Sequence, residues 1–207
     1  PTFTPQVLDL LDAHHAKGTF FMIGQRMEKY PGIVRQVVAR GHVIGNHTFS
    51  HPGAIEALTE VQITNDLELC EGVIERMTGK RTHLFRPPRG LIDGTVFTIA
   101  AERGYQTILW TVCADHRKAP TPEEMAQRVL RRLRPGAIIL VHDGRSPARA
   151  KDVTATRLII EELAERGYRF VTVPELLQAA AAGPADTFPP KWWLPAAAWL
   201  HRGTDPR

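Results

Sequence analysis

The sequence predicts an α/β protein whose strands run parallel. Six short segments rich in apolar, β-branched and aromatic residues alternate with longer segments of helical period. Most of the helical segments end in Gly, the usual C-terminal stop, and several begin at Thr or Asp, the usual N-terminal cap. Because regular strand–helix alternation produces parallel strands covered by helices, we expect that layered arrangement here.

The elements follow in chain order from these signals. The expected strands are 19–24 (TFFMIG), 42–46 (HVIGN), 83–88 (HLFRPP), 106–112 (QTILWTV), 137–143 (AIILVHD) and 169–173 (RFVTV). The expected helices are 4–18, 29–41, 59–79, 93–104, 121–136 and 152–167. An eightfold barrel typically needs about 250 residues. Six strands in 207 residues therefore indicate a smaller or incomplete barrel, with an open doubly wound sheet as the alternative.

Composition and charge exclude several classes of protein. Hydrophobic residues make up 43% of the chain and charged residues 23%, which is typical of a globular protein and not of a disordered one. The densest basic run, 128–136, places its arginines on the polar side of an amphipathic helix, so we expect a solvated face and no nucleic-acid partner. The two cysteines, Cys70 and Cys113, form no CxxC pair and support neither a disulfide framework nor a zinc ribbon.

Nothing in the sequence resembles a transmembrane segment or a signal peptide, so membrane association is not supported. The chain opens at Pro1 without a methionine, and we expect it to be a fragment of a longer protein. Its last part, 179–207, is rich in Ala, Pro and Trp. We interpret 179–207 as an extension of the domain formed by 1–178.

Polar residues collect at one end of the expected strands. In parallel α/β architectures the loops after the carboxyl ends of the strands converge on one face, and that face carries the chemistry. The residues at or just past these ends are His47, His51, Arg86, Asp115, His116, His142 and Asp143.

His47 and His51 lie four residues apart in "GNHTFSHP" (45–52), a turn stiffened by Pro52. Two imidazoles on one side of such a turn could chelate a metal such as zinc, cobalt, nickel or iron. An H-x-x-x-H pair also occurs by chance in loops, so the alternative is a turn that contains two histidines. Two ligands do not hold a catalytic metal, and a third must be found.

Two further segments carry candidate catalytic groups. In "FRPPRG" (85–90), Arg86 ends a strand, and the two prolines leave the backbone N–H of Arg89 as a fixed donor suited to an oxyanion. In "LVHDG" (140–144), His142 ends an apolar strand, where an imidazole can act as general acid or base. The alternatives are a surface salt bridge for Arg86 and a structural core histidine for His142.

Taken together, these motifs resemble the polysaccharide deacetylase family, also called the NodB-homology domain. The resemblance runs in order through "TFTPQVLDLLDAHHAKGTFFMIG", "ARGHVIGNHTFSHP", "FRPPRG", "LRPGAIILVHDG" and "ERGYRFVTVPELL", which covers essentially residues 1–178. It implies a distorted, seven-stranded (β/α) barrel and the metal-dependent removal of acetyl groups from N-acetylated sugars.

The resemblance also implies roles for single residues. His47 and His51 match the two metal-binding histidines of the family, and Arg86 matches the arginine that orients a catalytic aspartate. The predicted general acid is His142. The expected substrate-binding and oxyanion residues are Arg89, Leu140 and Trp110.

This chain departs from the family pattern in two places. The first motif, Thr-Phe-Asp-Asp-Gly-Pro, supplies the general base and the third metal ligand, and it is absent together with the first barrel strand. We therefore expect a chain truncated before that motif and inactive as given. The fourth motif, normally Asp-Trp, reads "WTVCADHRKAP" here. His116 takes the Asp position without a gap, and Asp115 takes it after a one-residue shift; we expect Asp115 to face His142.

The predicted function is a metal-dependent hydrolase that removes N-acetyl groups from N-acetylglucosamine-type polysaccharides or oligosaccharides. The expected cofactor is a divalent metal, zinc in the first place, with cobalt or nickel as alternatives. The expected partner is the glycan substrate, and the family implies a secreted or cell-envelope location. The alternative function is that of a catalytically impaired relative that binds a glycan or a partner protein.

Overall fold

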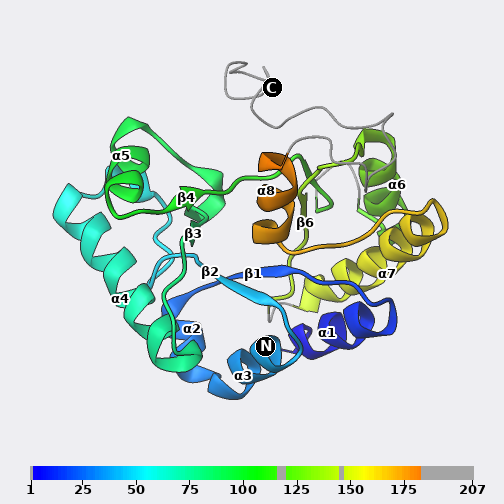
Figure 1. The fold of residues 1–207 in the computed structure, drawn as a ribbon, viewed down its shortest axis with the longest axis horizontal. Helices are drawn as coiled ribbons and strands as arrows, with labels where there is room; N and C mark the ends of the chain where they lie inside the picture. Colours follow the sequence, from blue (N-terminus) through cyan, green and yellow to red (C-terminus); the bar gives the residue numbers. More distant parts are fainter. Residues whose placement is uncertain (1, 116–119, 145–146, 183–207) are drawn as a thin grey trace.

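The structure is a computed structural model that describes residues 2–115, 120–144 and 147–182. Helices α1 to α7 follow one another along an outer rim, and the short strands lie inside it (Figure 1). The strands are β1 (Thr19–Met22), β2 (Val43–Asn46), β3 (Leu84–Phe85), β4 (Gln106–Thr107), β5 (Val112–Cys113) and β6 (Ile139–Leu140). The helices are α1 (Thr4–Ala13), α2 (Gly24–Lys29), α3 (Pro31–Ala39), α4 (Glu60–Thr78), α5 (Gly94–Glu102), α6 (Pro122–Arg132), α7 (Ala150–Glu165) and α8 (Val173–Ala181), with 3-10 turns η1 (Ile55–Ala57), η2 (Pro88–Gly90) and η3 (Pro147–Arg149).

The strands form two parallel sheets. The order β1-β2-β3-β4 makes up the larger sheet, and β5 pairs with β6 in a separate sheet. In the larger sheet Asn46 pairs with both Met22 and Phe85, and in the smaller one Cys113 pairs with Leu140. The predicted α/β class with parallel strands is confirmed. The predicted strand 106–112 is divided between the two sheets, since its first residues pair with β3 and its last with β6.

The prediction of a strand at 169–173 is wrong. Thr172 instead caps α8, a helix that we did not predict, because its side chain and that of Glu175 form a reciprocal capping box. The preceding residues still lie beside β1, since the Lys17 N–H donates to the Phe170 carbonyl at 3.2 Å. The predicted domain boundary at residue 178 falls inside α8, and the part of the extension from 183 to 207 lies outside the described residues.

A cavity of about 800 Å³ opens between the two sheets. Its walls include β1, the loop after β6, the 168–173 segment and the inner faces of α1 and α7. Among the described strands, β1 pairs only with β2, so this cavity lies along its other edge. The incomplete barrel and the count of seven strands stay predictions.

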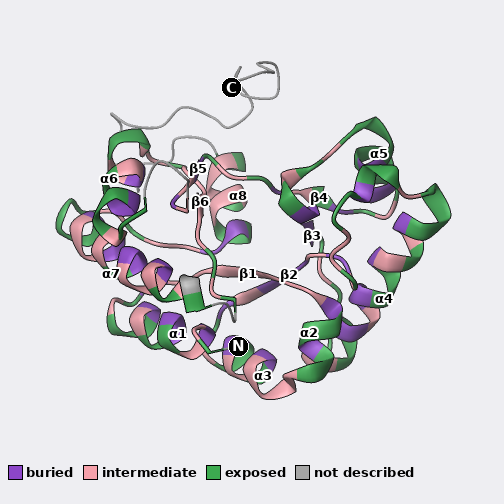
Figure 2. Cartoon of the chain, turned by 180° about the vertical axis from the view of Figure 1, so that it is seen from behind, coloured by how far each residue is buried: buried purple, intermediate pink, exposed green. Residues whose placement is uncertain are grey.

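Apolar side chains fill the space between the helices and the strands. Purple, buried surfaces face inward on the helices in Figure 2, and green, exposed surfaces face outward. The helices begin as their sequences predict: Thr59 opens α4 and Thr121 opens α6, each with a capping box. The structure contains no described helix long and apolar enough to span a bilayer.

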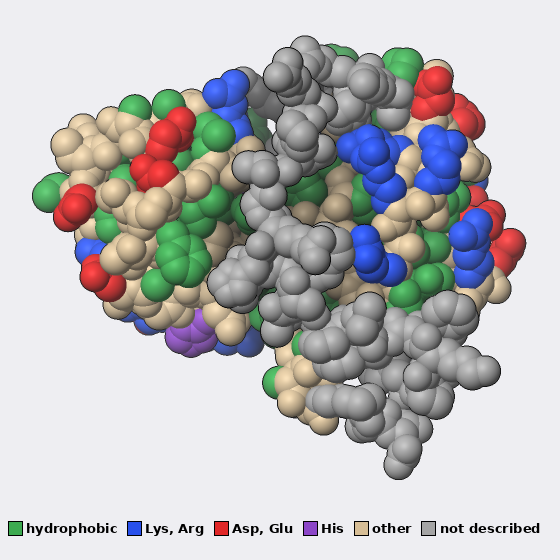
Figure 3. Space-filling model, turned by 90° about the horizontal axis from the view of Figure 1, so that it is seen from above, with side chains coloured by type: hydrophobic (Ala, Val, Ile, Leu, Met, Phe, Trp, Pro, Cys, Tyr) green, Lys and Arg blue, Asp and Glu red, His purple; other side chains and the backbone are tan. Residues whose placement is uncertain are grey.

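Figure 3 shows the molecule from above, with Lys and Arg side chains in several separate groups. Acidic side chains border these groups, and α6 itself carries Glu123 and Glu124 in its first turn and Arg131 and Arg132 in its last. The basic run thus lies beside acidic residues on a solvated helix.

Two leucines of α4 allow the effect of burial on stability to be measured apart from the effect of helix propensity. Leu67 is completely buried, while Leu69 is 55% exposed. We expect Leu67→Ala to lower the free energy of unfolding by about 2–5 kcal/mol, because it removes a packed side chain and leaves a cavity. The matched control Leu69→Ala should change it by less than about 0.5 kcal/mol. Urea denaturation measures both, and equal effects would contradict this assignment of the core.

Candidate active site

His47 and His51 lie side by side at the cavity wall. Their ring centroids are 4.9 Å apart, with 72° between the ring planes. Nδ1 of His47 lies 2.7 Å from the carbonyl oxygen of Arg86. Because a carbonyl can only accept, this nitrogen carries the proton, and Nε2 presents its lone pair. Burial lowers the pKa of His47 to about 4, so the ring is neutral at pH 7.

The turn that joins the two histidines is held in an unusual backbone conformation. Thr48 and His51 both have left-handed φ angles, 62° and 57°, which are uncommon for residues other than glycine. The Asn46 side chain accepts from the Thr48 N–H at 2.9 Å, and the Thr48 hydroxyl accepts from the His51 N–H at 3.0 Å. Asp66 of α4 accepts from the backbone N–H of Phe49 at 3.1 Å. These side-chain acceptors stabilise the strained backbone conformation in which the two histidines lie side by side.

A buried polar network connects this turn to α4. The Asn46 amide donates to the Tyr105 hydroxyl at 2.9 Å, and Tyr105 donates to the Glu71 carboxylate at 2.5 Å. The other oxygen of Glu71 accepts from the Thr82 N–H at 2.8 Å. Glu71 is only 2% exposed, so each lost contact would leave a buried polar group unsatisfied. Burial and the neighbouring Glu71 raise the pKa of Tyr105, which therefore stays a donor.

Arg86 is buried, and its contacts differ from those expected. Its guanidinium donates to the carbonyls of Ile108 at 3.0 Å and Leu109 at 2.9 Å. It also lies over the Phe21 ring, 4.0 Å from the centroid, and 5.9 Å from that of Trp110. Burial lowers the pKa of Arg86 to about 10. No described carboxylate forms an ion pair with it, so orienting an aspartate stays a prediction.

The turn after Arg86 packs against Trp110. Gly90 has a φ of 71°, and a Cβ there would lie 2.5 Å from the Trp110 ring, so only glycine fits. Arg89 is left-handed as well, with a φ of 59°. Its guanidinium donates to the Gly53 carbonyl at 2.9 Å and so ties the turn to the loop that follows His51.

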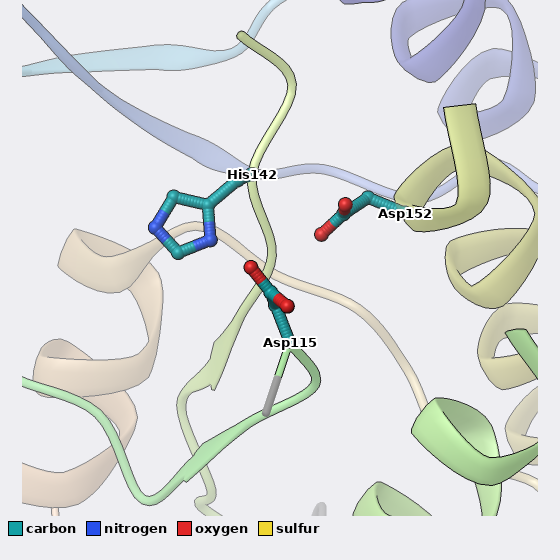
Figure 4. Close-up of side chains that lie close together, drawn as sticks. All are labelled: Asp115, His142 and Asp152. Atoms are coloured by element: carbon teal, nitrogen blue, oxygen red, sulfur yellow. The ribbon is translucent and has the colours of Figure 1, made fainter. Parts of the chain in front are cut away.

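A second cluster forms beside the smaller sheet. Because Cys113 pairs with Leu140, the residues two positions further, Asp115 and His142, leave the sheet together. Asp152 of α7 completes the group, and Figure 4 shows the three side chains pointing toward one another. One potential ligand atom from each lies within 4.8 Å of the others, so the three could hold a cation. The Arg149 guanidinium contacts both carboxylates.

The groups around His142 shift its pKa in opposite directions. Desolvation by the cavity walls and the positive charge of Arg149 lower the pKa of His142, while the three nearby aspartates raise it. Burial raises the pKa of Asp143, whose carboxylate contacts Thr4 of α1. Asp115 faces His142 as expected, and His116, the competing candidate, lies outside the described residues.

The cavity brings the predicted residues to one place. All of the predicted site residues except Asp115 line it, namely His47, His51, Arg86, Arg89, Trp110, Leu140 and His142. Within the described residues, Asp115, His142 and Asp152 are the only three His, Cys, Asp or Glu side chains grouped closely enough to hold a metal. His47 and His51 therefore have no third ligand of these types in that part of the chain.

Sequence reasoning missed several residues that hold the site. Asn46, Asp66, Glu71 and Tyr105 support the histidine turn through contacts between distant segments. Asp152 was interpreted as the cap of a helix, yet α7 begins at Ala150 and Asp152 lies in its first turn. No local pattern distinguishes these roles.

Comparison with known proteins agrees with the geometry. The polysaccharide deacetylase family pattern matches residues 1–108. The chain is 44% identical to a peptidoglycan-N-acetylglucosamine deacetylase of Bacillus cereus, over 86% of this chain and 83% of that protein. The chain belongs to the polysaccharide deacetylase family. Another relative, a chitooligosaccharide deacetylase of Azorhizobium caulinodans, is 32% identical over 84% of this chain and 88% of its own.

Solved structures of the deacetylase family share this fold. A peptidoglycan N-acetylglucosamine deacetylase, solved in complex with an N-oxidanyl-benzamide compound, matches with a TM-score of 0.81 at 35% identity, over 85% of this chain and 82% of that one. A CE4 family pseudoenzyme from Bacillus anthracis matches with a TM-score of 0.77 at 31% identity, over 85% of this chain and 60% of that one. The family thus contains both enzymes and a pseudoenzyme on one fold.

The buried network makes Tyr105 testable. Tyr105→Phe removes one hydroxyl, so that one N–H of the Asn46 amide and one oxygen of the Glu71 carboxylate each lose their partner, while the Asn46 contact with Leu67 and the Glu71 contact with Thr82 remain. We expect the free energy of unfolding to fall by about 1–3 kcal/mol. Tyr168→Phe is the matched control, because Tyr168 is half-buried and its hydroxyl makes no hydrogen bond with the described part of the chain. Urea denaturation that finds equal stability for both variants would contradict the network.

The lowered pKa of His47 predicts a pH dependence of stability. Between pH 6.5 and about 4 the unfolded chain binds a proton at this residue and the folded chain does not. The free energy of unfolding should therefore fall as the pH is lowered through this range, with a contribution of at most about 3 kcal/mol from His47. His47→Gln should lose that contribution in chelator-treated buffer, and His83→Gln, at an exposed position, should keep it. Superimposable pH profiles for the three proteins would contradict the assignment.

Proposed function

We propose that this chain carries the site of a metal-dependent hydrolase that removes N-acetyl groups from N-acetylglucosamine-type polysaccharides or oligosaccharides. The observation that carries the proposal is the orientation of His47, whose Nδ1 is bound by the Arg86 carbonyl while His51 lies beside it. Metal-binding histidines typically donate their second N–H in this way. The names of the relatives, peptidoglycan and chitooligosaccharide deacetylases, support the substrate class.

His47 and His51 would hold the metal. Two imidazoles suit zinc, and cobalt and nickel are the alternatives. When bound, such an ion would polarise the acetamide carbonyl and lower the pKa of a coordinated water. A catalytic zinc usually has three protein ligands, so the third would come from outside the described residues.

His142 would donate the proton that releases the amine. In the hydrolysis, the oxygen of water adds to the acetyl carbon and the carbon–nitrogen bond breaks. The nitrogen leaves with a proton from the His142 imidazolium, so that acetate and a free amino sugar are formed. His142 suits this role because its ring is exposed on the cavity wall, on the opposite sheet from the histidine pair.

The remaining predicted residues would bind the substrate. The backbone N–H of Arg89 would donate to the developing oxyanion, and Leu140 would form the wall of the acetyl pocket. Trp110 offers a ring face against which a sugar can pack, and Arg86 holds the neighbouring carbonyls in place. All four residues line the same cavity, which supports a common function.

The proposed substrate also implies a location. Glycans of the peptidoglycan type lie outside the cytoplasmic membrane, so we place the enzyme in the cell envelope or among secreted proteins. The glycan is the partner that we propose.

Metal binding and acetate release test the proposal together. Titration with Co²⁺, followed by its absorption spectrum, should show binding that is lost in His47→Ala and His51→Ala and kept in the control His83→Ala. Acetate release from N-acetylglucosamine oligomers would then be measured with zinc or cobalt, with and without added formate as an external carboxylate. We expect release to rise with formate and to fall about 10²–10⁴-fold in His142→Ala.

Two results would contradict the proposal. If His47→Ala binds Co²⁺ as the unchanged chain does, the metal assignment is wrong. If the chain binds the metal but releases no acetate with or without formate, the deacetylase assignment is wrong, and a module that binds a glycan or a partner protein explains the site better.

A further inference from the structure

The Asp115–His142–Asp152 cluster contains a carboxylate whose burial needs an explanation. Asp152 is only 1% exposed, and its Oδ1 has no hydrogen-bond partner among the residues that the structure describes. An unsatisfied buried carboxylate oxygen is destabilising, so such a group usually has a functional reason. Figure 4 shows the Asp152 carboxylate directed at His142 and Asp115 and not into the interior of α7.

We propose that Asp152 is a positioning residue for His142: together with Asp115 it fixes the Nδ1 side of the imidazole and leaves Nε2 for the substrate. The proposal rests on the function proposed above, in which His142 is the general acid. In Figure 4 the ring nitrogen nearer the backbone, Nδ1, faces both carboxylates, and Nε2 points away from them. A separation within 4.8 Å is bridged by a small side-chain rotation or by one water.

Arg149 explains how two carboxylates can lie together. Its guanidinium contacts Asp115 and lies 3.5 Å from Oδ2 of Asp152, so one positive charge holds both side chains in place. Burial raises the pKa of Asp152, and the charge of Arg149 and the N-terminus of α7 oppose that shift. Burial and the charge of Arg149 lower the pKa of His142, and the negative charges of Asp152 and Asp115 beside Nδ1 partly offset that shift.

The other charged groups near His142 do not replace Asp152. Asp143 is the next residue in the chain, and its carboxylate contacts Thr4. Lys151 acts on Asp115, and His47 lies close enough to His142 for their charges to repel. Asp115 is more exposed, with 25% of its side chain accessible, so solvent screens its charge more than that of Asp152.

A metal ion in the cluster is the competing explanation. The three ligand atoms are close enough, but the guanidinium of Arg149 already neutralises part of the carboxylate charge that a cation would need. A cation bound there would also displace Arg149 or occupy the nitrogen that orients the acid. We therefore favour the positioning role and use the metal as an outcome of the test.

Nitrogen NMR of the histidine side chains in the chain labelled with ¹⁵N-histidine tests the proposal directly. At neutral pH the unchanged chain should show His142 protonated at Nδ1 in its neutral form, and Asp152→Ala should shift it to a mixture with the Nε2-protonated form. The signals of His47 serve as an internal control and should stay unchanged. Glu161→Ala, on the same helix and paired with Arg157, should not alter His142.

Asp152→Asn keeps the size and an acceptor but removes the charge, and it replaces the alanine variant if that variant does not fold. We expect Asn to keep the Nδ1-protonated form while lowering the population of the imidazolium. If acetate release is measurable, Asp152→Ala should lower kcat about 10–100-fold with little change in KM.

Unchanged His142 signals in Asp152→Ala would overturn the proposal and leave Asp152 as a support for Arg149 alone. Zn²⁺ that shifts the His142 signals before those of His47 would overturn it in favour of a metal site. If the tautomer changes as expected but no deacetylation occurs with any metal, with or without formate, the positioning role holds and the proposed function fails.

Discussion

The register of the parallel strands decides where every group of the candidate site emerges. Asn46 is paired with Met22 and Phe85, so His47 and Arg86, the residues that follow, leave the larger sheet at one level. Because both residues leave the sheet at the same height along the strands, the His47 ring can donate to the Arg86 carbonyl. A slip of one residue would turn each of these side chains to the opposite face and separate the contacts.

Helix α4 holds the histidine turn that follows β2 in its conformation. The histidine turn contains two left-handed residues, and such a conformation persists only where its surroundings favour it. Asp66 and Glu71, about one and a half turns apart on α4, bind the turn directly and through Tyr105. The helix that buries Leu67 in the core therefore also holds the two imidazoles beside each other, and stability and site geometry depend on the same packing.

The sequence predicted those parts of the site that depend on local patterns. Strand ends followed by polar residues led to His47, His51, Arg86 and His142, because strand–helix alternation places all such ends on one face. The contacts of Tyr105 with Asn46 and Glu71 join residues 59 and 34 positions apart, and no local spacing encodes them.

Two errors had local causes. The β-branched run 169–173 resembled a strand, although the Thr172–Glu175 capping box signals the start of a helix. The run 106–112 was taken as one strand because periodicity does not reveal that its two ends pair with different sheets.

Because the strands form two separate sheets, the apolar side chains that line the cavity have a second role. The histidine pair belongs to one sheet and His142 to the other, and no described strand pairing joins β1 to β6. Val7 and Leu11 of α1 pack in one cluster with Ile160 of α7, and all three line the cavity. These side chains act as a spacer between the two halves of the site. A change in their size would therefore alter the distance between His142 and the histidine pair, even where the protein remained as stable as before.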